Sequence, residues 1–145
     1  MTNSVTEFLR WRSGAYLFGL ELGHCREIVN DVPLTRLPRS PAFVRGLANL
    51  RGTVITVIDL EVLLGYRKES AFTEEANIIR LRVQGYPIAV VADSINDTAF
   101  LGGDELERPP ANLTESESNF IRKVAKTKDG LVLVPDLQSI ASRIN

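Results

Sequence analysis

An internal repeat constrains the fold of this 145-residue chain more than any other feature of its sequence. The segment FLRWRSGAYLFGLEL, residues 8–22, resembles IIRLRVQGYPIAVVA, residues 78–92, at an offset of 70. Each segment holds two alternating runs around a glycine-containing turn, a pattern typical of a β-hairpin. Farther along, FVRGLANLRGTVITVIDL, residues 43–60, matches FIRKVAKTKDGLVLVPDL, residues 120–137, at an offset of 77. Two matched pairs in the same order predict two similar β lobes.

The segments between these repeats indicate a mainly β fold. Most predicted strands are short and joined by Gly, Pro or Asn turns, which favours small, twisted, barrel-like sheets. The proline-rich residues 33–41 should form an extended connector, and the polar residues 66–77 should link the lobes. We therefore expect a single domain over residues 1–145 with lobes of about residues 1–75 and 76–145. The sequence leaves open whether a strand or helix is exchanged between the lobes.

Helical patterns in the sequence are few and short. Thr114 and Glu117 have the spacing of a capping box, which predicts a short helix directly after Thr114. Apolar residues after Asp136 recur at helical spacing and predict a C-terminal amphipathic helix.

Composition excludes several classes of function. Seventeen basic residues face eighteen acidic ones, for a net charge of −1, so no general electrostatic attraction to nucleic acid or anionic lipid is expected. Cys25 is the only cysteine, which rules out an internal disulfide and fits a reducing compartment. The chain opens without an apolar stretch of signal-peptide length, and its apolar runs are too short to span a bilayer. These features predict a cytoplasmic protein that does not insert into the membrane.

The titratable residues do not form a catalytic pattern. His24 and Cys25 are adjacent, and neighbours on a strand point to opposite faces, so we expect one buried thiol and one exposed imidazole. Zinc would need about four closely spaced ligands, which are absent from the sequence. Asp59 and Asp136 each follow a strand and precede apolar residues at helical spacing, so both are predicted to cap helices. The sequence therefore predicts no enzyme, no cofactor and no metal.

Arg51 lies at the start of a predicted strand, and its counterpart in the repeat is Lys128. One interpretation is structural: a solvated charge in a turn, or a guanidinium that ties two backbone carbonyls together. The other is functional: an arginine presented at a rigid turn for a carboxylate or carbonyl of a partner. Glycines on both sides would let another backbone come close, which favours the second interpretation slightly. Asp129 is interpreted as a one-residue insertion relative to the first copy.

Three segments of the chain resemble one protein family. They are VPLTRLPRSPAFVRGLANLRGTVITVIDLEVLLG, with NLRG at its centre, YLFGLELGHCREIV upstream, and FIRKVAKTKDGLVLVPDLQSI downstream. The prolines, NLRG and both Asp-Leu pairs are similar in order and spacing to those of CheW-like chemotaxis adaptors. The resemblance covers roughly residues 8–144.

The resemblance implies a fold of two five-stranded β-barrel lobes and a non-catalytic adaptor. Its partners would be the cytoplasmic tip of a methyl-accepting chemoreceptor, docked between the lobes, and the regulatory domain of a chemotaxis histidine kinase, docked at a barrel end. Recruitment to membrane receptor arrays would follow. Carried over by motif, the partner-binding residues would be Arg51, with Asn49, Gly46 and Gly52 shaping its turn, together with Glu27 and Cys25. Whether Glu27 and Arg51 pair across the surface is left open.

The chain departs from the family pattern at Thr56, where a proline is usual, so strand geometry is expected to differ there. Ala48, Ala89 and Lys123 also differ from the residues usual at their positions. Two alternatives for the function remain: a two-barrel binding module for another ligand, or an adaptor in a pilus-type or other chemosensory pathway.

Overall fold

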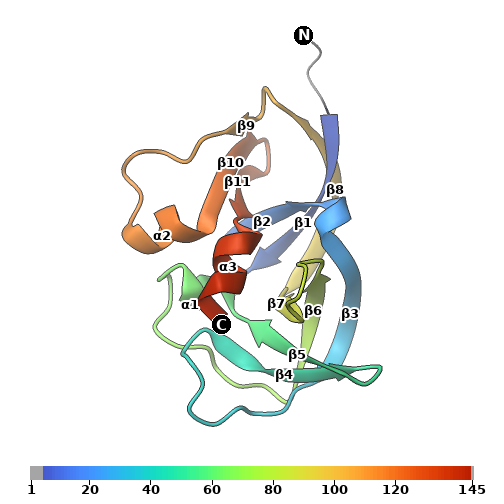
Figure 1. The fold of residues 1–145 in the computed structure, drawn as a ribbon. Helices are drawn as coiled ribbons and strands as arrows, with labels where there is room; N and C mark the ends of the chain where they lie inside the picture. The colour runs from blue at the N-terminus through green and yellow to red at the C-terminus, as the bar shows by residue number, and fades with distance from the viewer. Residues whose placement is uncertain (1–4, 145) are drawn as a thin grey trace.

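The computed structural model describes residues 5–144, which form two curled β-sheets and a few short helices (Figure 1). The strands are β1 (Val5–Ser13), β2 (Tyr16–Glu21), β3 (Cys25–Pro33), β4 (Val44–Leu50), β5 (Thr53–Ile58), β6 (Glu75–Leu81), β7 (Ile88–Val91), β8 (Ser94–Gly102), β9 (Leu106–Glu107), β10 (Ile121–Thr127) and β11 (Gly130–Pro135). The helices are the 3-10 helix η1 (Leu22–His24), α1 (Leu60–Leu63), α2 (Glu115–Phe120) and α3 (Leu137–Ile144). The mainly β, two-lobed fold predicted from the sequence is confirmed.

Each sheet combines strands from both halves of the chain. Lobe A is the six-stranded sheet in the order β8-β1-β2-β11-β10-β9, and lobe B is the five-stranded sheet β3-β6-β7-β5-β4. The first hairpin of the chain, β1–β2, thus lies in one sheet with the C-terminal strands β8 to β11. The matching hairpin β6–β7 lies in the other sheet with the N-terminal strands β3, β4 and β5. The two junctions, β2 with β11 and β7 with β5, are both parallel. The exchange that the sequence left open is reciprocal, and a cut at residue 75 would divide both sheets.

The repeat extends to the register of the strands. Every Cα partner pair between β4 and β5 recurs between β10 and β11 at an offset of 77, including the bulge after the first pair. Leu50 opposite Thr53 closes one turn, and Thr127 opposite Gly130 closes the other. Both turns have two central residues, so Asp129 occupies the position of Gly52. The interpretation of Asp129 as an insertion is therefore wrong.

Both predicted helix caps are confirmed. The Asp59 Oδ1 accepts hydrogen bonds from the N–H groups of Glu61 and Val62 at 3.0 and 3.4 Å, and the Asp136 Oδ1 accepts one from Ser139 at 3.1 Å. The two lobes repeat this corner closely. In each, the backbone N–H of the aspartate donates at 2.8 Å to the carbonyl of a phenylalanine, Phe43 or Phe120.

The other predicted helices also form. Thr114 and Glu117 make the reciprocal bonds of a capping box at the start of α2. The C-terminal helix is α3, with its apolar side buried at Ile140 and Ala141. Both helices lie at the open end of the β10–β11 hairpin, where β10 begins and β11 ends (Figure 1).

The connecting segments differ partly from expectation. Residues 66–74 run from α1 to β6 inside lobe B, so they do not link the lobes as predicted. The proline-rich connector, expected to be extended, is so only in part: Pro33 ends β3 and Thr35 bridges to Leu47 of β4, but a turn with a positive φ angle at Arg39 follows. The Thr56 N–H donates to the Pro87 carbonyl at 3.0 Å, which joins β5 to the strand beside it. A proline at position 56 would lack this donor.

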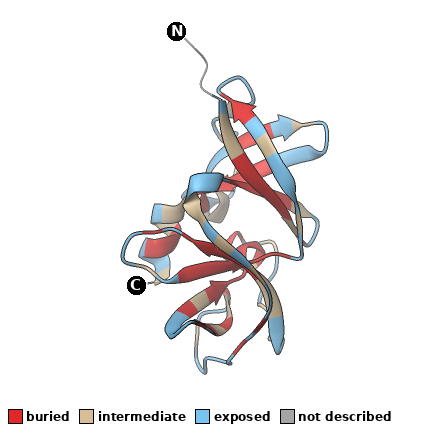
Figure 2. Cartoon of the chain, turned by 90° about the vertical axis from the view of Figure 1, so that its right-hand side faces the viewer, coloured by how far each residue is buried: buried red, intermediate tan, exposed pale blue. Residues whose placement is uncertain are grey.

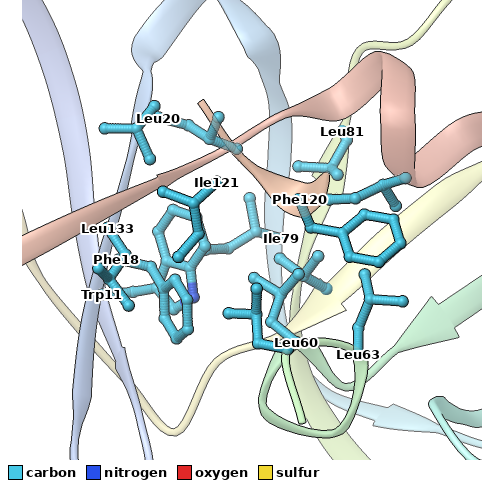
Figure 3. Packing of buried hydrophobic residues seen from close by; sticks show 14 of the residues in the cluster. Trp11, Phe18, Leu20, Leu60, Leu63, Ile79, Leu81, Phe120, Ile121 and Leu133 are labelled. Carbon is cyan, nitrogen blue, oxygen red and sulfur yellow. The ribbon is translucent and has the colours of Figure 1, made fainter. Parts of the chain in front are cut away.

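The larger of two hydrophobic clusters fills the space between the lobes. Trp11 is fully buried there and stacks on Phe18 with ring centroids 5.8 Å apart, while Leu60 and Ile79 approach from lobe B (Figure 3). A smaller cluster around Ile55 lies within lobe B. Buried residues line the inner strands of both lobes, and exposed ones lie at turns and loops and along the outer strands β3 and β8 (Figure 2). Because one core serves both sheets, the lobes pack as a single unit.

Candidate partner-binding site

The NLRG segment forms the tip of the β4–β5 hairpin. Arg51 and Gly52 are its two central residues, with φ angles of 52° and 86°, which is the pattern of a type I′ turn. Gly52 adopts this conformation freely, whereas a positive φ is strained for an arginine. The Asn49 Oδ1 accepts a hydrogen bond of 2.9 Å from the Gly52 N–H and fixes the turn. Asn49 and Gly52 thus hold Arg51 at an outward-facing tip.

Gly46 has a different local environment. It lies inside β4, where it is buried and opposite Val57. A Cβ atom at this position would lie 2.9 Å from the Thr35 carbonyl oxygen. Gly46 therefore lets the proline-rich connector approach β4 closely, and it lies outside the turn that presents Arg51.

Arg51 donates a hydrogen bond from Nη2 to the Glu27 Oε1 on β3. The Arg80 Nη1 on β6 lies 3.4 Å from the same oxygen. Because β3 and β4 are the two outer strands of lobe B, the Arg51–Glu27 pair joins the edges of the sheet and closes it. In Figure 1 the tip of the β4–β5 hairpin lies beside β3. The pairing that the sequence left open is formed.

Arg80, Glu27 and Arg51 form an ion triad whose two arginines differ in exposure. The hydrogen bond from Arg51, followed by that from Arg80, holds the pKa of Glu27 below its ordinary value despite some desolvation. The Arg51 side chain is 68% exposed, against 9% for Arg80. A guanidinium carries five N–H donors in a planar fork. Arg51 therefore binds Glu27 and still presents donors to solvent, as the functional interpretation requires.

Cys25 begins β3 directly after η1, and its thiol lies 3.8 Å from the Glu21 carbonyl oxygen. A bulge separates Cys25 from Glu27 in the pairing with β6. Cys25 and His24 are both partly buried, so the expectation of one buried and one exposed side chain is wrong. Burial raises the pKa of the Cys25 thiol to about 11, which keeps it protonated at neutral pH.

Sequence reasoning missed the ion network beneath Asp59. This carboxylate is fully buried, and its Oδ2 accepts hydrogen bonds from Arg45 at 3.1 Å, Arg67 at 2.6 Å and Ser70 at 2.9 Å. Among residues 5–144, Asp136 has no such arginine partners. Sequence reasoning also missed that Arg80 contacts Glu27. The match of Arg80 with Arg10 in the repeat was a signal that both arginines have equivalent places in their lobes.

Residues 5–144 contain no group of three or more His, Cys, Asp and Glu side chains that could hold a metal ion. Over the same residues, no helix has the length and apolarity needed to cross a membrane.

Comparison with known proteins gives the family of this two-lobed β fold. The model of the CheW-like domain matches residues 7–145. The chain belongs to the CheW-like family.

Individual relatives cover nearly the full chain. It is 27% identical over 140 residues to the chemotaxis protein CheW of Rhizobium meliloti, a match that covers 97% of this chain and 90% of that protein. It is 26% identical over 136 residues to a probable chemotaxis protein CheW of Rhizobium etli, covering 94% and 87%. The crystal structure of the scaffolding protein TtCheW from Thermoanaerobacter tengcongensis is similar, with a TM-score of 0.77 and 26% identity over 92% of this chain and 90% of that one.

Proposed function

We propose that this protein is a non-catalytic scaffold that couples chemoreceptors to a chemotaxis-type histidine kinase. The observation that carries the proposal is the family match over residues 7–145, supported by a similar fold in a scaffolding protein. The relatives named as chemotaxis proteins favour this function over a binding module for an unrelated ligand. The protein would act in the cytoplasm beside receptor arrays.

The absence of catalysis is supported by what the candidate groups do instead. Asp59 and Asp136 each cap the helix that follows them, and Asp59 also neutralises two arginines. Cys25 is held as a thiol rather than a nucleophilic thiolate. These side chains serve the fold.

The partner surface would centre on Arg51, with Asn49 and Gly52 holding its turn and Glu27 orienting its guanidinium. Cys25, two residues from Glu27 on β3, would lie at the edge of this surface. Gly46 would contribute indirectly, through the path of the connector. The partners would be the regulatory domain of the kinase and the cytoplasmic tip of the receptor.

Binding measurements with both partners test the proposal. The purified chain should retain the kinase regulatory domain and a receptor-tip fragment from its own organism in pull-downs. Arg51→Ala should leave the chain folded and weaken receptor control of the kinase. The matched control is Lys128→Ala, at the corresponding turn of lobe A, which should bind as the wild type does. A wild-type chain that binds neither partner would overturn the proposal.

A further inference from the structure

Two adjoining hollows on the surface bring cations from both lobes together. One, of about 210 Å³, lies between Arg122 and Lys123 of β10 and Arg82, just after β6. The other, of about 650 Å³, is lined by Arg26, Arg80 and the same Arg82. The shared wall of residues 82–84 places the two hollows side by side. We call them together the basic hollow.

The charge of the basic hollow is largely uncompensated. Arg26, Arg82, Arg122 and Lys123 are exposed, and none forms a salt bridge within residues 5–144. Two acidic residues line the smaller part, Glu21 and the helix cap Asp136, and no Asp or Glu lines the larger part. A chain with a net charge of −1 thus carries a concentrated positive region.

Two features of the backbone place these residues around the hollow. A bulge in β10 lies between Ile121 and Lys123, and it leaves two successive side chains, Arg122 and Lys123, exposed on a strand that would otherwise alternate. On the opposite side, the Arg82 N–H donates to the His24 carbonyl at 2.8 Å, which ties the end of β6 to η1. The backbone therefore places the cationic side chains of both lobes around the same hollow.

We propose that the basic hollow binds a protein segment that presents several carboxylates. Arginine forks pair with carboxylates through two parallel hydrogen bonds, and Lys123 adds a point charge. Nucleic acid is a poorer fit, because the chain is acidic overall and the only aromatic side chains that line the hollow are the buried Phe8 and the half-buried Tyr86. The inference rests on the proposed function, since it gives the chemistry of the partner segment that docks between the lobes.

A labelled peptide tests this chemistry without knowledge of the partner. The probe is a helical, alanine-based peptide of about 20 residues with glutamate at every fourth position, and the control peptide has glutamine at those positions. Fluorescence anisotropy with the full chain at low salt should show binding of the glutamate peptide only. Raising the salt to about 0.3 M should weaken it, because screening shortens the range of exposed charges.

Charge reversal locates the binding site. The triple variant Arg82→Glu, Arg122→Glu, Lys123→Glu should bind the glutamate peptide at least about tenfold more weakly. Lys126→Glu is the matched control, because Lys126 is exposed on the same strand outside the basic hollow, and it should bind as the wild type does. Circular dichroism establishes that each variant is folded.

The outcomes separate this inference from the proposed function. Equal binding of both peptides, an equal loss with Lys126→Glu, or tighter binding of a single-stranded oligonucleotide of similar charge would overturn the acidic-segment inference. If the wild type binds the glutamate peptide through the basic hollow but binds neither kinase domain nor receptor tip, the inference stands and the proposed function fails.

Discussion

Each lobe contains an ion triad, and the two triads differ in the charge of the member that comes from the hairpin tip. In lobe B, Glu27 is the centre and lies between two arginines, Arg80 and Arg51. In lobe A, the centre is an arginine that lies between two carboxylates. Arg10 matches Arg80 and Asp97 matches Glu27 at an offset of 70, and in both lobes the third member comes from the tip of the equivalent hairpin.

The two triads also differ in how exposed their arginines are. The Arg10 side chain is 9% exposed and binds Asp97 at 2.9 and 3.1 Å and Asp129 at 3.1 Å. Its N–H groups therefore bond to side chains of the same lobe. In lobe B the centre is the half-buried carboxylate Glu27, and the hairpin tip supplies the exposed cation Arg51. The two triads thus share an arginine and a carboxylate at matching positions and differ at the hairpin tip, where lobe A has the carboxylate Asp129 and lobe B has the exposed cation Arg51.

The largest difference between the lobes should appear at the two helix caps. Asparagine caps helices about as well as aspartate, so Asp136→Asn should change the free energy of unfolding by less than about 0.5 kcal/mol. Asp59→Asn should cost about 3–5 kcal/mol, because it leaves the half-buried Arg45 and its neighbour Arg67 without their shared, fully buried counter-charge. Urea unfolding of both variants measures the difference. Equal costs would show that Asp59 is only a cap.

Replacing Arg10, the centre of the lobe A triad, should lower the free energy of unfolding more than replacing Arg51 at the hairpin tip of lobe B. Arg10→Ala removes charge-assisted hydrogen bonds to Asp97 and Asp129, and we expect it to cost about 1–3 kcal/mol. Arg51→Ala removes an exposed ion pair and should cost less than about 1 kcal/mol. The midpoints of chemical denaturation provide the test, and a larger loss for Arg51→Ala would reverse the assignment of roles.

The strained turn predicts an order among variants of Arg51. Arg51→Gly loses the pair with Glu27 but relieves a positive φ angle, whereas Arg51→Ala loses the pair and keeps the strain. The glycine variant should therefore be about 1 kcal/mol more stable than the alanine variant. Thermal unfolding of the two proteins decides this, and an alanine variant at least as stable would mean that the turn is not strained.

The smallest effect concerns pH. The pKa of Glu27 is lowered in the folded chain, chiefly by Arg51, so its stabilising contribution is present above the unfolded value of about 4.3 and is lost as the pH falls through the folded value. The gap in stability between wild type and Arg51→Ala should shrink as the pH falls from 7 to about 3. Urea titrations across this range measure it. A gap that widens toward acid would contradict the assigned pair.

Much of the fold could be predicted because the repeat consists of short-range sequence patterns. Alternation, turns and the two Asp-Leu pairs are short-range features, and they recur at constant offsets. The reciprocal exchange of hairpins could not be predicted, because it depends on the parallel contacts of β2 with β11 and β7 with β5, which are distant in sequence. Asp129 was misjudged because the two turns place glycine differently: Gly52 is central in one, whereas Gly130 follows the central pair in the other.

The candidate site was predicted in part. Arg51 was singled out because the second copy replaces NLRG with a different turn, and the family resemblance pointed to Glu27. Arg80 was missed because its contact with Glu27 arises across paired strands. The sequence also gave no indication that Arg51 closes the sheet, since this requires β3 and β4 to be its outer strands.

Receptor control of kinase activity in reconstituted arrays tests the central claim most directly. The variants are Arg51→Gly, which fits the turn without strain, and Lys128→Gly as the matched change in lobe A. At equal folded concentration, we predict that Arg51→Gly needs at least about tenfold more protein to restore receptor control, while Lys128→Gly matches the wild type. Full coupling by Arg51→Gly, or an equal loss in both variants, would contradict the assignment of the lobe B turn to partner binding.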